Sequence, residues 1–226
     1  MEILIYYGLP IIGTIIVLFA QFSISSNYKK YSGIKNNKNI SGSEIARIIL
    51  DKNGLNNIYV VETSGELTDH YDPSRKVVRL SKNIYRGTSI ASISVAAHEV
   101  GHAIQDKEGY SFMRIRSFLV PIVNLTTYLG YFGLIISIFA GITGYLKVSI
   151  IILLASLLFQ LVTLPVEFDA SKRAKKQLNE LGVVNSDEAN GVKIMLFAAA
   201  LTYVASFLSN ILQLLRLVLM LGGRDD

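Results

Sequence analysis

The hydrophobic positions of this chain fall into long uncharged runs separated by polar and charged stretches. Residues Ile3 to Phe22 carry no charge, and about 20 apolar residues suffice to cross a bilayer as a helix. Uncharged runs follow at Ser117 to Leu146, at Val148 to Val166 and at Ile194 to Leu215. This pattern predicts four membrane spans, with a tight turn near Thr143 to Lys147 joining the second to the third.

The first run fits either an anchor or a signal peptide. A signal peptide opens with basic residues, but Glu2 stands in that region. Ala20-Gln21-Phe22 also lacks the small residues of a cleavage site. We therefore expect an uncleaved first anchor over residues 1–24.

Residues 25–116, between the first and second spans, are patterned like a small folded domain. Ser41-Gly42-Ser43-Glu44 has the spacing of a capping box, which predicts a short amphipathic helix that stops near Gly54. The β-branched stretches Ile58 to Glu62 and Val77 to Leu80 predict two strands that pair as a small sheet.

A second helix of this domain is expected from Thr88 or Ser89 to about Asp106. Apolar residues recur there at helical spacing, and Gly109 follows as a stop signal. Small residues within this segment, Gly101 among them, would allow another element to approach the helix closely.

This second helix contains the chemical motif H-E-x-x-H, formed by His98, Glu99 and His102. Residues four apart lie on one face of a helix, so the two imidazoles can bind a single Zn²⁺ ion. Glu99 projects beside the metal, where it can take a proton from zinc-bound water. The alternative is a non-catalytic metal site or a surface pair of histidines. With three histidines in the whole chain, chance rarely produces this spacing around a glutamate.

Composition supports the membrane interpretation and narrows the ligand set. A hydrophobic share of 51% with 17% charged residues and a mean hydropathy of +0.42 is too apolar for an ordinary soluble domain. There is no cysteine, so a transition metal must be bound by histidine, carboxylate or water. The net charge of +5 comes from basic residues between the apolar runs, so we expect a lipid bilayer as partner and no nucleic acid. The pattern indicates no oligomeric state.

Two crossings between Arg116 and Glu167 return the chain to the side of the patterned domain. Lysine and arginine are concentrated on that side, and the positive-inside rule makes it cytoplasmic, with both termini outside. We therefore expect a multi-pass protein of the plasma membrane whose catalytic domain lies in the cytoplasm.

A catalytic zinc site usually has three protein ligands and one open position. His70 and the acidic residues are the candidates for the third. Glu167 stands where the third span emerges, on the same side as His98, and we expect it to be the ligand. Asp169 is the reserve ligand, or an acceptor for the free N–H of a ligand histidine. The competing interpretation of Glu167 is a solvated helix end.

Two further predictions concern the surroundings of the metal. His70, in a turn between the predicted strands, or its neighbour Tyr71 is a candidate donor for the oxyanion that forms during amide hydrolysis. A surface or capping histidine is the plainer interpretation. Val77 to Ser81 is predicted to be an edge strand that pairs with the extended substrate backbone, or else a buried strand without a ligand.

Four segments together resemble the YugP-type, zinc-dependent membrane peptidases of bacteria, and the likeness covers nearly the whole chain. They are Asp69-His70-Tyr71-Asp72-Pro73, Val78-Arg79-Leu80-Ser81, Ala96-Ala97-His98-Glu99-Val100-Gly101-His102-Ala103-Ile104-Gln105 and Leu164-Pro165-Val166-Glu167-Phe168-Asp169-Ala170-Ser171. The resemblance implies an integral membrane metallopeptidase, more distantly similar to HtpX-type gluzincins with a two-histidine, one-glutamate zinc site. Those distant relatives typically have an aspartate four residues after the ligand glutamate, whereas here Ser171 occupies that place.

The predicted fold class is an α-rich integral membrane protein with about four transmembrane helices and a small α/β zincin-like domain. The expected parts are the anchor (1–24), the H-E-x-x-H domain (25–116) and a transmembrane hairpin (117–166). A charged loop or helix with the third zinc ligand (167–193) and a fourth span with a tail (194–226) complete them.

The predicted function is hydrolysis of peptide bonds in membrane or membrane-proximal proteins by a Zn²⁺-dependent endopeptidase. The first alternative is a membrane assembly or binding factor that retains zinc without turnover. The second is a transporter or channel subunit with a zinc-regulated loop. That class places paired charges within its spans, and the first three runs contain essentially none.

Overall fold

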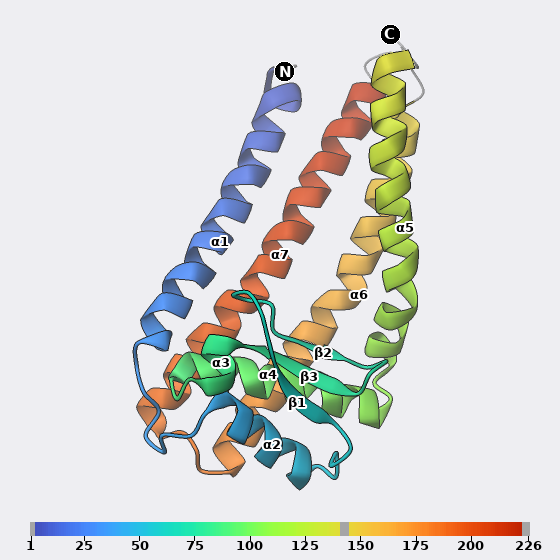
Figure 1. Ribbon diagram of the computed structural model, residues 1–226. Coiled ribbons are helices and arrows are strands. Elements are labelled where there is room, and N and C mark those ends of the chain that lie inside the picture. Colours follow the sequence, from blue (N-terminus) through green and yellow to red (C-terminus); the bar gives the residue numbers. More distant parts are fainter. Residues whose placement is uncertain (1–2, 141–144, 223–226) are drawn as a thin grey trace. The chain divides into compact units, whose positions relative to one another are not determined.

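The computed structural model describes residues 3–140 and 145–222 of the chain, and Figure 1 traces them. They divide into two compact units. Of the described residues, the first contains 3–21, 114–140, 145–164 and 201–222, and the second contains 22–113 and 165–200. Each unit is described separately below.

Long helices make up the first unit. After a short π-helical segment, η1 (Leu4–Gly8), come most of α1 (Leu9–Ser32) and α5 (Ser111–Ala140), followed by the apolar parts of α6 (Tyr145–Glu180) and α7 (Ser186–Gly222). Within the described residues, three helices are long and apolar enough to cross a membrane, over Ile5–Ser32, Val148–Glu180 and Ser186–Met220. These correspond to the first, third and fourth predicted spans.

The second predicted span begins within α5, a continuous helix of 30 residues. Its predicted end and the turn expected near Thr143 to Lys147 fall partly on residues 141–144, which lie outside the described part of the chain.

Small and polar side chains mediate helix contacts within the first unit. A Cβ added to Gly13 on α1 would lie 2.8 Å from Ser209 Oγ on α7, so the absence of a side chain permits that approach. Between α6 and α7, Asn210 Nδ2 donates a hydrogen bond to Gln160 Oε1 at 3.1 Å. Both contacts are of the kind that joins helices in membranes.

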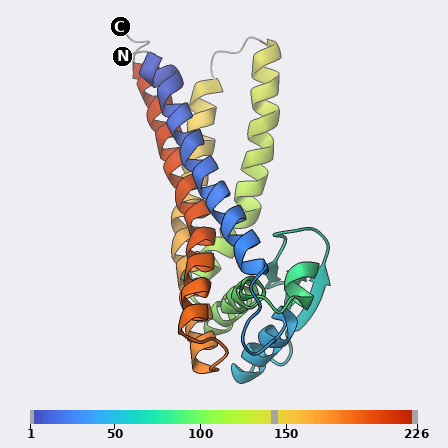
Figure 2. The ribbon, with the colours of Figure 1, turned by 90° about the vertical axis from the view of Figure 1, so that its left-hand side faces the viewer.

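The second unit contains a three-stranded sheet of β1 (Tyr59–Thr63), β2 (His70–Asp72) and β3 (Val77–Ser81), in the order β1-β3-β2. β1 pairs with β3 in parallel, and β2 pairs with β3 antiparallel. Figure 2 shows the strands gathered with α2 (Gly42–Lys52) and α3 (Lys82–Arg86).

The sheet corrects two expectations. β3 is the central strand, so of the two interpretations of Val77 to Ser81 the edge strand was wrong and the buried strand is the one observed. Four of its five residues are buried, which suits a strand paired on both sides. His70, expected in a turn, opens the short strand β2. Nothing in the polar stretch around it indicates a strand, and β2 exists because its backbone pairs with β3 while the Tyr71 ring is buried.

The two predicted helices of this unit are confirmed, and they form its core. α2 begins at the Ser41 capping box, with both reciprocal hydrogen bonds present. α4 (Ile90–Glu108) is capped by Ser89 and ends at Gly109, whose left-handed backbone has φ of 65°. The core is built from fully buried side chains on both helices, including Ile45, Ile49, Leu50, Ile93 and Val100.

The charged segment expected over residues 167–193 is largely helical, since α6 continues to Glu180 and α7 begins at Ser186. Buried residues recur there at intervals of four, at Val166, Ala170, Ala174 and Leu178, while Lys172 and Lys176 are exposed. The apolar first part of α6 is therefore followed, in the same helix, by an amphipathic part whose buried face packs on a protein core. Glu167 is therefore held on a rigid element.

Candidate metal centre

His98 and His102 lie one turn apart on α4, as the motif predicted. Their ring centroids are 4.8 Å apart, with the ring planes 84° to each other. The His98 side chain is 14% exposed and that of His102 is 7% exposed. Both rings are thus held inside the protein, and His98 keeps the greater access to solvent.

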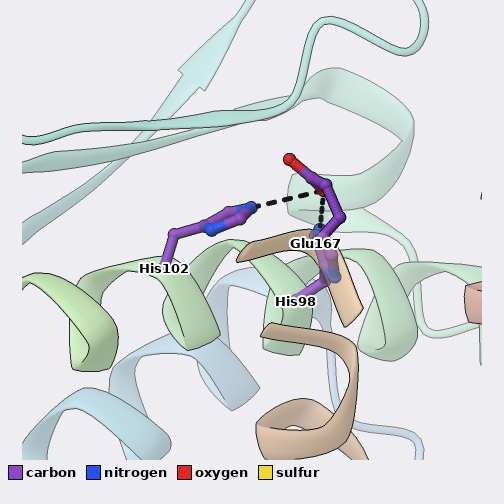
Figure 3. A group of neighbouring side chains, drawn as sticks. All are labelled: His98, His102 and Glu167. Atoms are coloured by element: carbon purple, nitrogen blue, oxygen red, sulfur yellow. Dashed lines mark hydrogen bonds and ion pairs between the residues drawn. The ribbon is translucent and has the colours of Figure 1, made fainter. Parts of the chain in front are cut away.

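Glu167 reaches these rings from α6. Its Oε2 lies 3.2 Å from His98 Nε2 and 3.7 Å from His102 Nε2, and Figure 3 shows both dashed lines meeting at the carboxylate. A close approach of the two helices allows this contact. A Cβ on Gly101 would lie only 2.7 Å from the backbone oxygen of Ala170, so a larger residue would push α6 away from α4.

The geometry of these three residues fits a zinc ion. Their ligand atoms lie within 4.8 Å of one another, and no other such group of histidine and acidic residues occurs in the described part of the chain. A tetrahedral ion with bonds of about 2.0–2.1 Å holds neighbouring ligand atoms about 3.3 Å apart. The separations of 3.2 and 3.7 Å from Glu167 Oε2 bracket that value, whereas the group as a whole extends to 4.8 Å and its ligand atoms would have to move closer together around an ion. Two imidazoles and one carboxylate also form a donor set typical of catalytic zinc.

Gln105 sets the tautomer of His102. Its Nε2 donates to the Val166 carbonyl at 2.8 Å and to Asp169 Oδ2 at 2.9 Å. Both partners are acceptors, so the amide orientation is determined and Oε1 faces His102 Nδ1 at 3.0 Å. Nδ1 must therefore carry the proton, which leaves the lone pair of Nε2 for a metal.

His98 has a comparable support on α6. Ser171 Oγ lies 3.2 Å from His98 Nδ1. When Nε2 binds a metal, Nδ1–H can donate to this hydroxyl and hold the plane of the ring. A hydroxyl group on α6 therefore contacts this imidazole.

Gln105 and Ser171 were not predicted as site residues. Their signals were their spacings, because Gln105 lies three residues after His102 and Ser171 four residues after Glu167, each on the same helical face as the ligand. Asp169 lies outside the three-residue group. It accepts from Gln105 and from Arg173 Nε, so its contact with His102 runs through the Gln105 amide.

The remaining predicted residues, Glu99, His70 and Tyr71, are not members of the three-residue group. Glu99 is buried on α4, next to His98. His70 is exposed on β2, with its Nδ1 2.7 Å from the Thr68 carbonyl, and it does not belong to the three-residue group. The Tyr71 hydroxyl donates to Asp106 Oδ2 at 2.7 Å. Burial, and then the hydrogen bond to Asp106, raise the pKa of Tyr71, so this hydroxyl stays protonated.

The Gln105 contact leads to a first testable prediction. Gln105→Met keeps the length of the side chain but removes the acceptor for His102 Nδ1. We expect zinc affinity to fall by about 10- to 100-fold, the usual effect of losing such an outer partner. Competition with a chromophoric chelator would measure it, and Gln177→Met on α6 is the control. Unchanged affinity in the Gln105 variant would show that the amide does not orient the ring.

Comparison with known proteins agrees with this donor set. The family described as "Putative neutral zinc metallopeptidase" matches residues 6–222, nearly the whole chain. The chain belongs to this family. The zinc in the description of this family fits the two histidines and the glutamate that lie together in this chain.

A curated relative extends the family assignment to the membrane. The chain is 46% identical over 209 residues to the protein of Bacillus subtilis (strain 168) described as "Putative membrane protease YugP". The match covers 92% of this chain and 93% of the relative. No solved structure matches the chain significantly. The family assignment and the three membrane-capable helices together make this a membrane protein of a zinc metallopeptidase family.

Proposed function

We propose that the protein is a membrane-embedded zinc endopeptidase of the gluzincin type, with His98, His102 and Glu167 as metal ligands and Glu99 as the general base. One observation carries the proposal. Two helices that lie far apart in the sequence bring two imidazole nitrogens and a carboxylate oxygen within 4.8 Å of one another. The zinc family and the membrane protease relative support the same reaction.

A Zn²⁺ ion held by His98, His102 and Glu167 would supply a water molecule of lowered pKa and would polarise the substrate carbonyl. Glu99 accepts the proton from the attacking water and passes it to the leaving amine, which requires a carboxylate beside the ligands rather than among them. Gln105 and Ser171 hold the two imidazoles with Nε2 directed at the metal. His70 is a candidate donor to the oxyanion; because its Nδ1 donates to the Thr68 carbonyl, its Nε2 can donate to an oxyanion only in the imidazolium form.

We further propose four membrane spans. Three helices qualify by length and composition, and α5, which contains the second span in chain order, would be the additional one. The second unit would then be a zincin-like domain on the cytoplasmic side of a bacterial plasma membrane, in accord with its lysines and arginines. Membrane or membrane-proximal proteins are the substrates that such a placement favours. Since β3 is central, an extended substrate backbone would pair with an edge strand, β1 or β2.

A zinc-binding assembly factor without turnover is the main rival, and metal removal separates the two. Purified protein in detergent is expected to cleave a quenched peptide library, to stop when a chelator removes the metal and to recover when Zn²⁺ is restored. Fluorescence measures the rate, and protein treated with the metal-saturated chelator is the control. Failure of the zinc-loaded protein to cleave any peptide, while it still binds zinc tightly, would favour the assembly factor.

A further inference from the structure

A cavity of about 870 Å³ lies in the second unit, and none of the three metal ligands lines it. Its walls come from the end of α1 and the residues after it, from the segment between β1 and β2, from α3, and from the start of α4. The proposed peptidase mechanism makes no use of this cavity.

The cavity is lined by more cations than anions. Lys29, Lys35, Lys82 and Arg86 contribute to its walls, and Glu66 is the one acidic residue in its lining. Arg86 is paired with Glu62. For the three lysines, no carboxylate within ion-pair distance occurs in the described residues. The negative charge of Glu66 offsets only part of the positive charge of the lysines, so the net charge that lines the cavity is positive and favours an anionic ligand.

The position of the cavity along α1 places it near the surface of a bilayer. The last turns of this helix line the cavity, including Ser25 and Lys29; the predominantly apolar run of the same helix ends at Phe22, and Lys29 is its first charged residue. Lys29 lies seven positions after Phe22 along the helix, a rise of about 10 Å. A lysine at that distance from the apolar run lies at the depth of lipid headgroups.

The cavity also has an apolar part next to its cations. Leu67, in the segment between β1 and β2, lines the cavity and remains 48% exposed. Its backbone has φ of 55°, an uncommon conformation for a leucine. An exposed leucine beside lysines suits a ligand with both an anionic group and an apolar portion.

We propose that this cavity binds the headgroup of an anionic phospholipid. The phosphate would lie among Lys29, Lys35 and Lys82, and the glycerol and upper acyl chain would contact Leu67. Clusters of basic residues beside a membrane helix attract anionic lipids in this way. Free inorganic phosphate shares the charge but not the apolar portion, and it would not be concentrated at the bilayer surface. The proposal is independent of peptidase activity.

The first test measures binding to the full chain in a non-ionic detergent. Short-chain phosphatidylglycerol, phosphatidylcholine with the same acyl chains and inorganic phosphate are titrated separately, and the shift in unfolding temperature reports binding. We expect saturable stabilisation by phosphatidylglycerol at concentrations where the other two have little effect. Equal stabilisation by both lipids, or tight binding of inorganic phosphate alone, would overturn the proposal.

The second test locates the site. The double variant Lys35→Gln, Lys82→Gln removes two charges from the cavity, and Lys38→Gln, Lys172→Gln removes two exposed charges elsewhere. At about fivefold per lysine, the first pair should weaken phosphatidylglycerol binding roughly 25-fold and the second pair little. All four side chains are exposed, so unfolding temperatures without lipid should match that of the wild type. Equal weakening by both pairs would mean general attraction to charge and no site.

Discussion

Replacing Glu99 by glutamine should leave zinc in place and reduce peptide hydrolysis by roughly 10²- to 10⁴-fold, the usual contribution of a positioned general base. Glutamine has the shape of glutamate but cannot accept the proton of the attacking water. Glu99 lies beside the ligands, and the clustered donor atoms belong to the other three residues. Zinc content should therefore stay near one ion per chain, as measured by elemental analysis.

A matched variant separates this effect from a general loss of charge. Glu180 is an exposed carboxylate near the end of α6, paired with Lys52. Glu180→Gln should hydrolyse peptide at the wild-type rate, because surface pairs contribute little. Equal hydrolysis by the Glu99 variant and the wild type would remove Glu99 from the mechanism, whether or not the protein binds zinc.

The second large effect is expected at the third ligand. Glu167→Gln should weaken zinc binding by more than about a hundredfold, beyond the 10- to 100-fold that an outer partner costs. An amide oxygen carries no full charge and is a poor zinc ligand compared with a carboxylate. Hydrolysis should be lost at ordinary zinc concentrations, and chelator competition would measure the affinity.

Asp169→Asn provides the comparison on the same helix. The amide oxygen of asparagine can still accept from Gln105 Nε2, so we expect a loss of roughly tenfold or less in zinc affinity. Both variants exchange a carboxylate for an amide, and unfolding temperatures of the metal-free proteins test whether the two variants fold equally well. Zinc retained in the Glu167 variant and lost in the Asp169 variant would reverse the assignment of the ligand.

Helix α2 and the metal-binding helix α4 could be predicted from the sequence because their signals are local. A capping box starts α2, and a left-handed glycine ends α4. The H-E-x-x-H spacing places two imidazoles on one face by helical geometry alone. Each of these features depends on residues a few positions apart, so the order of the residues is sufficient evidence.

The features that were missed depend on contacts between distant segments. β2 has no β-forming residues beyond Tyr71 and is a strand because β3 pairs with it. For residues 167–193 the sequence left loop and helix open, and the helical course of residues 167–180 depends on small buried residues that pack against the domain core. Gln105 contributes to the centre only once Val166 and Asp169 lie beside it, 61 and 64 residues later in the sequence.

That separation between the two ligand-bearing helices has a consequence for the synthesis of the protein. The ribosome completes the H-E-x-x-H helix well before it adds Glu167, which follows the long apolar stretch of α6. Under the proposed mechanism, a nascent chain that ends before Glu167 has two zinc ligands and cannot assemble the full site. Proteolytic capacity would therefore appear only after most of the apolar helices have been made, so that the insertion machinery handles an inactive precursor.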